Sequence, residues 1–166
     1  MFRPFADWLA ATGLSQLLQN ELWVVPTSQS IHIICVCMVF TSALMINLRL
    51  LGVWSASRTI SELTGALLPW MWGGLVVLLL TGTVQTVAEP VREFVAPMFW
   101  AKLIMVVIVT VMTAGFAGKV RSNAARWDAA GPRPNGARAF ATGSTLLWVA
   151  IIVCGRFIGY TSALYT

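Results

Sequence analysis

The chain has 166 residues, of which 58% are hydrophobic and 10% are charged, whereas soluble domains average roughly 25% charged residues. A water-soluble fold of this size cannot bury so much apolar surface, and the mean hydropathy of +0.79 agrees with that exclusion. The net charge of +5 does not indicate nucleic-acid binding, because five of the eleven basic residues fall in one connection and are not grouped with aromatic side chains.

The first twenty residues predict an amphipathic helix over residues 3–20. Asp7 interrupts the segment, which therefore lacks the long apolar centre of a signal peptide. The apolar residues that recur at near-helical spacing are Phe2, Phe5, Trp8, Leu9, Leu17 and Leu18. Such a helix lies flat at the membrane interface or packs as a cap on the rest of the protein, and the sequence leaves both alternatives open.

Four apolar segments follow, each long enough to cross a hydrocarbon core of about 30 Å. They cover residues 28–53, 65–87, 98–120 and 140–164. Only helices are expected, because open strands leave backbone groups unpaired in lipid. Pro69 is expected to kink the second helix or to separate it from an interfacial turn. The predicted fold class is therefore all-α: a four-helix transmembrane bundle in a single domain over residues 1–166, with an interfacial N-terminal helix.

The basic residues predict the orientation of this bundle. The first and third connections share one side of the membrane, and they carry Arg49, Arg58, Lys119, Arg121, Arg126, Arg133 and Arg138. Cytoplasmic connections are enriched in Lys and Arg, so both termini are expected on the outer side. The loop character of the third connection is indicated by Gly131, Pro132, Pro134 and Gly136.

Polar side chains from all four spans fall at one level near the outer side. These are His32, Gln85, Lys102 and Arg156, and Tyr160 shares the helix face of Arg156. Ionisable groups inside a span are costly and often mark functional sites. The pattern predicts a cationic pocket that contains one imidazole and suits an anionic ligand.

Haem b fits this pattern. His32 is then the axial ligand of the iron, and Lys102 and Arg156 pair with the propionates. The sequence has no second histidine, so the other axial ligand is Met98, Met105, water, or His32 of another subunit. The competing interpretation is structural: Lys and Arg near helix ends extend to the interface, a histidine bonds the backbone, and a methionine stripe packs.

Copper is an alternative metal, because His32 and Cys35 share a helix face and soft ligands select Cu(I). Against it, an intramembrane cysteine often serves as a small apolar residue. Gly155 and Gly159 form a G-x-x-x-G pair, which indicates close helix contact within the chain or with a second copy.

Several short motifs resemble an uncharacterised family of small bacterial four-helix membrane proteins. They are the early His32, the run Leu48-Arg49-Leu50-Leu51-Gly52, Thr81-Gly82, and Phe99-Trp100-Ala101-Lys102-Leu103. That family is similar in layout to copper-resistance protein D and to membrane b-type cytochromes. The resemblance covers about half the chain and implies a location in the bacterial inner membrane. It marks His32, Lys102 and Arg49, whereas Asn47 stands where the family carries an acidic residue, which argues against a proton-coupled role.

The function expected from the sequence is haem-b-linked electron transfer at or across the outer face of the membrane, without catalytic activity of its own. The alternatives are an accessory or assembly subunit of a membrane complex, and a small permease for copper or an organic anion. The expected partners are the lipid bilayer and a second copy or larger membrane complex, and not nucleic acid.

Overall fold

The computed structural model describes residues 2–54, 57–129 and 136–161, and within these ranges the chain forms eight helices and no strand. Four helices are long and apolar enough to cross a membrane, which confirms the predicted fold class. They are α3 (Val24–Leu51), α4 (Ile60–Ala88), α6 (Pro97–Ser122) and α8 (Ala137–Thr161). The predicted loop residues Gly131, Pro132, Arg133 and Pro134, and residues 162–164 of the last span, lie outside the described residues.

Helix α4 begins earlier than the hydropathy pattern predicts. A capping box fixes its start: Thr59 Oγ1 accepts a hydrogen bond from the Glu62 amide at 3.3 Å, and the Glu62 carboxylate accepts one from the Thr59 amide at 3.0 Å. The helix then continues through Pro69 to Ala88. The separate interfacial turn that was one of the two alternatives for Pro69 therefore does not form.

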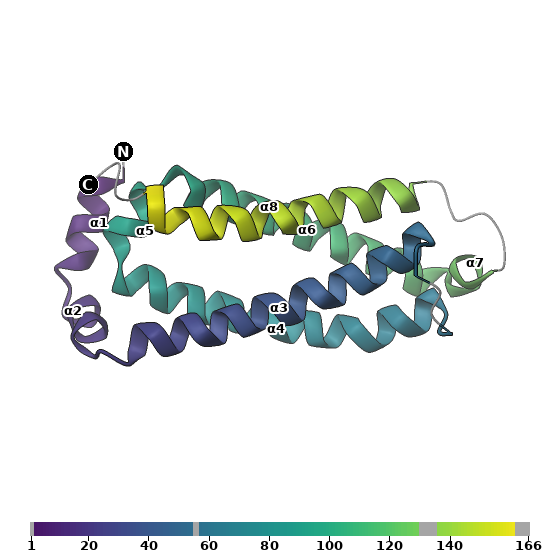
Figure 1. Cartoon of the computed structure of the whole chain (residues 1–166), viewed down its shortest axis with the longest axis horizontal. Coiled ribbons are helices and arrows are strands. Elements are labelled where there is room, and N and C mark those ends of the chain that lie inside the picture. Colours follow the sequence, from purple (N-terminus) through teal and green to yellow (C-terminus); the bar gives the residue numbers. More distant parts are fainter. Residues whose placement is uncertain (1, 55–56, 130–135, 162–166) are drawn as a thin grey trace.

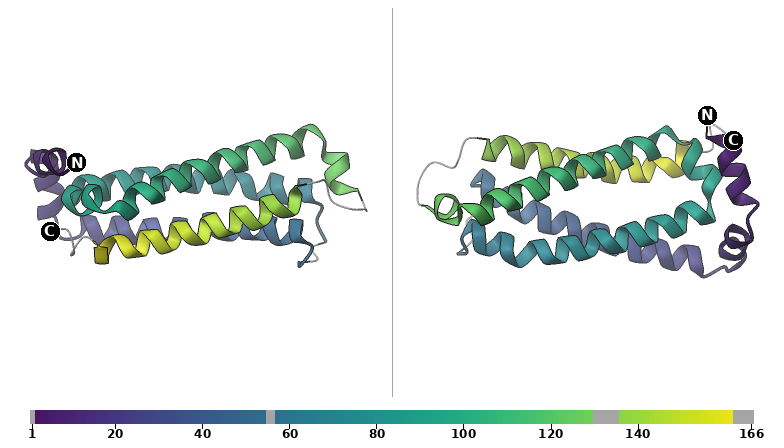
Figure 2. Two further views of the ribbon diagram at one scale, coloured as in Figure 1. Left: turned by 90° about the horizontal axis from the view of Figure 1, so that it is seen from above. Right: turned by 180° about the vertical axis from the view of Figure 1, so that it is seen from behind.

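The four long helices form two antiparallel pairs, α3 with α4 and α6 with α8, and α3 also packs along α8 (Figures 1 and 2). Among the neighbouring pairs of long helices, α4 and α6 contact each other least. They converge toward one end of the bundle and are separated at the other (Figure 1). The short helix α5 (Pro90–Val95) connects them at the wide end.

The closest approach between α3 and α4 is at Gly74. A Cβ atom added there would lie 2.5 Å from Val39 Cγ2 and 2.8 Å from Met38 Cε, so only glycine permits this contact. Val39 and Met71 lie at the centre of an apolar cluster that also contains Trp148 of α8. Small residues at helix contacts are typical of membrane bundles.

A buried polar contact joins α3 to α8. The side-chain amide of Asn47 donates hydrogen bonds to Ser144 Oγ at 3.2 Å and to Thr145 Oγ1 at 3.1 Å. Asn47 is almost completely buried, and without partners its amide would be costly in an apolar interior.

The N-terminal segment forms two short helices, α1 (Arg3–Ala10) and α2 (Gly13–Asn20), and not the single helix expected over residues 3–20. Thr12 ends the first by donating to the Leu9 carbonyl at 2.6 Å and caps the second by accepting from the Ser15 amide at 3.4 Å. Helix α1 covers α5: Phe5 packs edge-on against Phe94 with ring centroids 5.4 Å apart. Phe5 is still 48% exposed, so α1 caps the bundle and also presents apolar surface.

At the opposite end, helix α7 (Ala124–Asp128) contacts the start of α4. The Asp128 carboxylate accepts a hydrogen bond from the Ser61 amide at 3.0 Å and another from the Ser61 hydroxyl. A carboxylate at a helix N-terminus is favoured by the helix dipole. Burial acts to raise the pKa of Asp128, but the hydrogen bonds from Ser61 outweigh it and hold the pKa below its usual value.

We expect Gly74→Ala to destabilise the protein relative to Gly73→Ala. Both substitutions improve helix propensity by up to about 1 kcal/mol, and a Cβ at Gly73 meets nothing within 4 Å. The Gly74 variant additionally forces Val39 to move, which costs about 1–3 kcal/mol. Thermal unfolding in detergent measures the difference, and equal stability of the two variants would show that α3 and α4 are not this close.

We expect Asp128→Asn to remove an acid-sensitive contribution to stability. A carboxyl whose pKa is lowered by folding stabilises the fold above its unfolded-state pKa, and this contribution disappears as the pH falls through its folded-state pKa. Because Asp128 is only partly buried, the loss at neutral pH should be about 1 kcal/mol or less. Unfolding measured from neutral to acid pH should show a shallower decline for the variant, and parallel curves would contradict the assignment.

Candidate functional site

His32 is held by a hydrogen-bonded chain at the wide end of the bundle. Its Nδ1 lies 2.8 Å from Thr81 Oγ1 on α4, and the Thr81 hydroxyl donates to the Val77 carbonyl at 2.8 Å. A hydroxyl has one hydrogen, so Thr81 accepts from His32 and Nδ1 carries the proton. In its neutral form the imidazole is therefore held in the Nδ1-protonated tautomer, which leaves a lone pair on Nε2.

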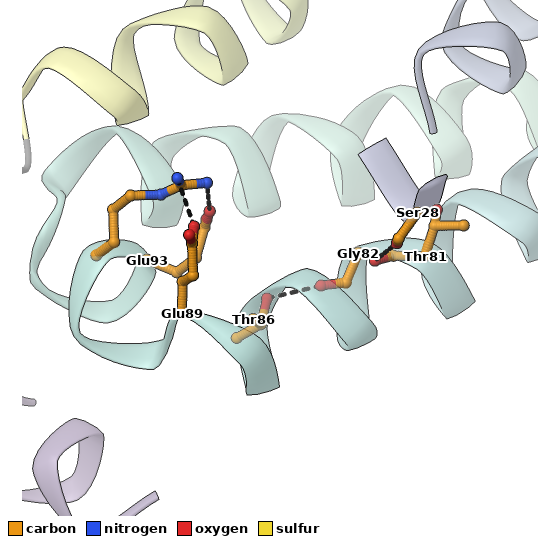
Figure 3. A network of polar contacts seen from close by, with 7 residues as sticks. Ser28, Thr81, Gly82, Thr86, Glu89 and Glu93 are labelled. Atoms are coloured by element: carbon orange, nitrogen blue, oxygen red, sulfur yellow. Dashed lines mark hydrogen bonds and ion pairs between the residues drawn. The ribbon is translucent and has the colours of Figure 1, made fainter. Parts of the chain in front are cut away.

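The backbone around Thr81 positions this ring. A Cβ atom at Gly82 would lie 3.7 Å from His32 Cε1, so the imidazole lies directly beside the α4 backbone. The Ser28 hydroxyl, one turn before His32, donates to the Thr81 carbonyl at 3.2 Å (Figure 3). Two side chains of α3 therefore bond to the same residue of α4, and the imidazole has little freedom to rotate.

Lys102 enters the same end of the bundle from α6. Its side chain crosses Gly155 of α8, where an added Cβ would lie 3.6 Å from Nζ and 3.8 Å from Cε. The ammonium interacts electrostatically with His32 and with Glu93. Within the described ranges no carboxylate lies at ion-pair distance from it. Gly155 thus serves a contact within the chain, whereas a Cβ at Gly159 would meet nothing within 4 Å.

Helix α5 contributes a group of charged residues next to Lys102. Arg92 pairs with Glu89 and, from Nη2, with Glu93 Oε1 at 3.5 Å; these ion pairs are drawn as dashed lines in Figure 3. Glu93 is only 8% exposed. Burial raises the pKa of Glu93 above its usual value, and the charges of Arg92 and Lys102 act against that rise.

Sequence reasoning missed Glu93, because this residue lies outside the four apolar segments in which polar side chains were considered. The available signal was the order Glu89-Pro90-Val91-Arg92-Glu93. Proline favours the first position of a helix, and Glu89 and Arg92 are three residues apart, a spacing that allows contact on a helix. The segment therefore indicated a short helix with internal ion pairs and not an open loop.

Two buried donors at this end have no acceptor among the described residues. They are Nε2 of Gln85, one turn beyond Thr81 on α4, and Nε of Arg92. Most buried polar groups in proteins are hydrogen-bonded, so each exception needs an explanation. These two donors and the Lys102 ammonium outnumber the one buried acceptor without a hydrogen bond at this end, Glu89 Oε2, which is ion-paired with Arg92. This imbalance suits a ligand that carries carboxylate or other acceptor oxygens.

The structure places the remaining predicted site residues elsewhere. Arg156 is exposed and donates to Tyr160 Oη at 3.2 Å, with its guanidinium over the Tyr160 ring. Met105 packs against the apolar cluster around Val39, and Met98 is 37% exposed. His32, Gln85 and Lys102 thus gather at one end of the bundle, whereas Arg156 and Tyr160 interact with each other at its surface.

The structure groups no further metal-binding side chains of the described residues with the predicted copper ligands His32 and Cys35. Cys35 is buried on α3 and not disulfide-bonded. In the part of the chain that the structure describes, no three side chains of His, Cys, Asp or Glu are grouped so that they could hold a metal ion. Any copper site would therefore need methionine or a second copy to complete it.

Residues 9–161 match a family of unknown function, DUF6644. The chain belongs to this family. The match covers nearly all of the described bundle and confirms the predicted relation to an uncharacterised family. Neither a curated protein nor a solved structure matches the chain.

We expect Thr81→Val to release the tautomer of His32. His32 is the only histidine, so ¹⁵N labelling of histidine reports on this imidazole alone. The wild-type protein should show the neutral form protonated at Nδ1, and the variant, which keeps the side-chain shape but lacks the acceptor, should show a mixture of tautomers. Protonation of the wild-type ring at Nε2 alone would contradict the hydrogen-bonded chain described above.

Proposed function

We propose that this membrane protein binds haem b through Nε2 of His32 and takes part in electron transfer. The observation that supports this most directly is the bond from His32 Nδ1 to Thr81. Histidines that ligate metals typically donate their other ring nitrogen to a fixed acceptor, which orients the ring and raises its basicity. Because the Thr81 hydroxyl is itself bonded to Val77, the Nε2 lone pair remains available for the iron.

The surrounding residues fit the rest of the group. The Lys102 ammonium and the buried donors of Gln85 and Arg92 suit propionate oxygens. Bound haem supplies one-electron redox chemistry. The protein's part is to orient the imidazole through Thr81, to balance negative charge through Lys102, and to exclude water with the apolar helices.

Lys102 takes the main propionate role in this proposal, and Arg156 would reach a propionate only by leaving Tyr160. The second axial position is assigned to Met98, Met105, water, or His32 of a second copy. The basic residues at the α7 end favour a bacterial inner-membrane protein with both termini on the periplasmic side. The site would then lie near the outer face, in a layout similar to that of membrane b-type cytochromes and copper-resistance protein D.

A second candidate function is an assembly subunit of a membrane complex. It is favoured by Gly115 and Gly118, where an added Cβ would meet nothing within 4 Å. Such open small-residue positions permit close approach of another helix. In this case the partner is a second copy or a different membrane protein, and the charged end is structural.

The deciding experiment is the absorption spectrum of protein purified from haem-replete cells, first oxidised and then reduced. We expect a Soret band that His32→Ala abolishes. Lys102→Met should weaken haem binding roughly tenfold to a hundredfold, because a charge-assisted hydrogen bond contributes about 1.5–3 kcal/mol. Arg156→Met should have a smaller effect, and Lys119→Met, at the far end of α6, is the matched control.

A colourless wild-type preparation would rule out the haem proposal. Copper in stoichiometric amount would then favour the copper permease, and binding of a haem-free carboxylate at Lys102 would favour an organic-anion permease. Oligomers that dissociate on Gly118→Leu, with no bound cofactor, would favour the assembly subunit. Gly155→Leu is unsuitable for this purpose, because Gly155 contacts Lys102 within the chain.

A further inference from the structure

The charged residues of the α5 end, at the same end of the bundle as His32, form a balanced set that depends on Lys102. Arg92 is shared between two carboxylates, those of Glu89 and Glu93. These three side chains together carry one positive and two negative charges when ionised. The Lys102 ammonium, which interacts electrostatically with Glu93, supplies the second positive charge. With Lys102 included, the set has no net charge. A further anion beside Lys102 would leave it with a net negative charge.

We propose that Glu93 is a proton-binding site coupled to the ligand site, and that it takes up one proton from solution when an anionic ligand engages Lys102. The inference rests on the proposed function in taking a haem propionate as that anion. The step balances: the ligand brings one negative charge to Lys102, and one solvent proton forms an O–H bond on the Glu93 carboxylate. No electron moves and no bond of the ligand breaks.

Glu93 is the member of the set best placed to accept this proton. Its side chain is 10% exposed, whereas that of Glu89 is 35% exposed and can stay ionised in contact with water. Burial already raises the pKa of Glu93, and Lys102 is one of the charges that limit the rise. Removing the influence of Lys102 therefore moves Glu93 further toward its neutral form.

Other ionisable groups stand on the helices that pack against α5. Helix α1 carries Arg3 and the exposed Asp7, and α8 carries Cys154 and the exposed Arg156. Asp7 and Arg156 are exposed at the surface of the bundle, and the charges that act on the pKa of Glu93 are those of Arg92, Lys102 and Glu89. The group that joins Glu93 to the imidazole is Lys102, because it interacts with both.

The position of Glu93 on α5 also supplies an acidic group near the site. The spans contain no acidic residue near His32. Glu93 reaches the same end of the bundle from α5, outside the spans. A carboxylate is therefore available to take up protons beside the site, although the sequence of the spans alone argues against it.

The first test measures proton uptake when haem b is added to the purified protein in weak buffer. We expect uptake approaching one proton per haem, no uptake by Glu93→Gln, and none with haem dimethyl ester, which keeps the iron but lacks the propionate charges. In the pH range in which Glu93 is ionised in the free protein, haem affinity should fall up to tenfold for each unit by which the pH is raised. The haem affinity of Glu93→Gln should not change with pH in that range. Protonation of His32 has the opposite pH dependence, because it weakens ligation of the iron as the pH falls.

The outcomes separate this inference from the proposed function. A Soret band without proton uptake, or with equal uptake by Glu93→Gln, would overturn the inference and leave haem binding in place. If haem does not bind, the inference is decided on the haem-free protein by infrared spectroscopy. Lys102→Met should then show a protonated carboxyl band at neutral pH that is absent from Lys119→Met and from the double variant with Glu93→Gln. Absence of that band would overturn the inference.

Discussion

The hydrogen bond between His32 and Thr81 is the constraint around which the candidate site is organised. It links α3 to α4 about two turns before α4 ends, and with the hydroxyl of Thr81 donating to Val77 it places a proton on Nδ1. The hydroxyl that accepts it already donates to the Val77 carbonyl, so the direction of both hydrogen bonds is fixed. A single contact thus decides which nitrogen can bind a metal and where that nitrogen lies.

The rest of the bundle keeps polar chemistry at this end. Toward the centre the helices meet through apolar side chains and the close contact at Gly74. At the wide end, α5 brings in charges from outside the spans, and α1 covers α5 with aromatic rings. Charged side chains are costly in hydrocarbon. Their concentration under this cap, close to the membrane surface, reduces that cost while it keeps them beside His32.

Depth in the membrane could be predicted from the sequence, because each helical residue rises 1.5 Å. Counting residues along each span predicts that His32, Gln85 and Lys102 lie at one level, and in the structure they lie at the same end of the bundle. It also placed Arg156 there, but depth does not give the rotation of a helix about its axis. Rotation depends on which small residues face a neighbour: Gly155 faces Lys102, and its sequence neighbour Arg156 therefore turns outward to Tyr160. Glu93 was missed for a different reason, because hydropathy treats a short charged connection as solvent-exposed.

The placement of Gly155 bears on how the charged end can change on ligand binding. A side chain that extends beyond Cβ at this position would meet the Lys102 side chain, so the glycine leaves room for the ammonium, which interacts with the imidazole and with Glu93. Lys102 is then the one cation that interacts with both groups in the described chain. Negative charge arriving on the imidazole side weakens the hold of Lys102 on Glu93, and the buried carboxylate must compensate by binding a proton or by becoming hydrated. Phe5 of α1 packs on Phe94 of α5, and this cover is the physical reason why the proposal assigns the compensation to protonation and not to hydration.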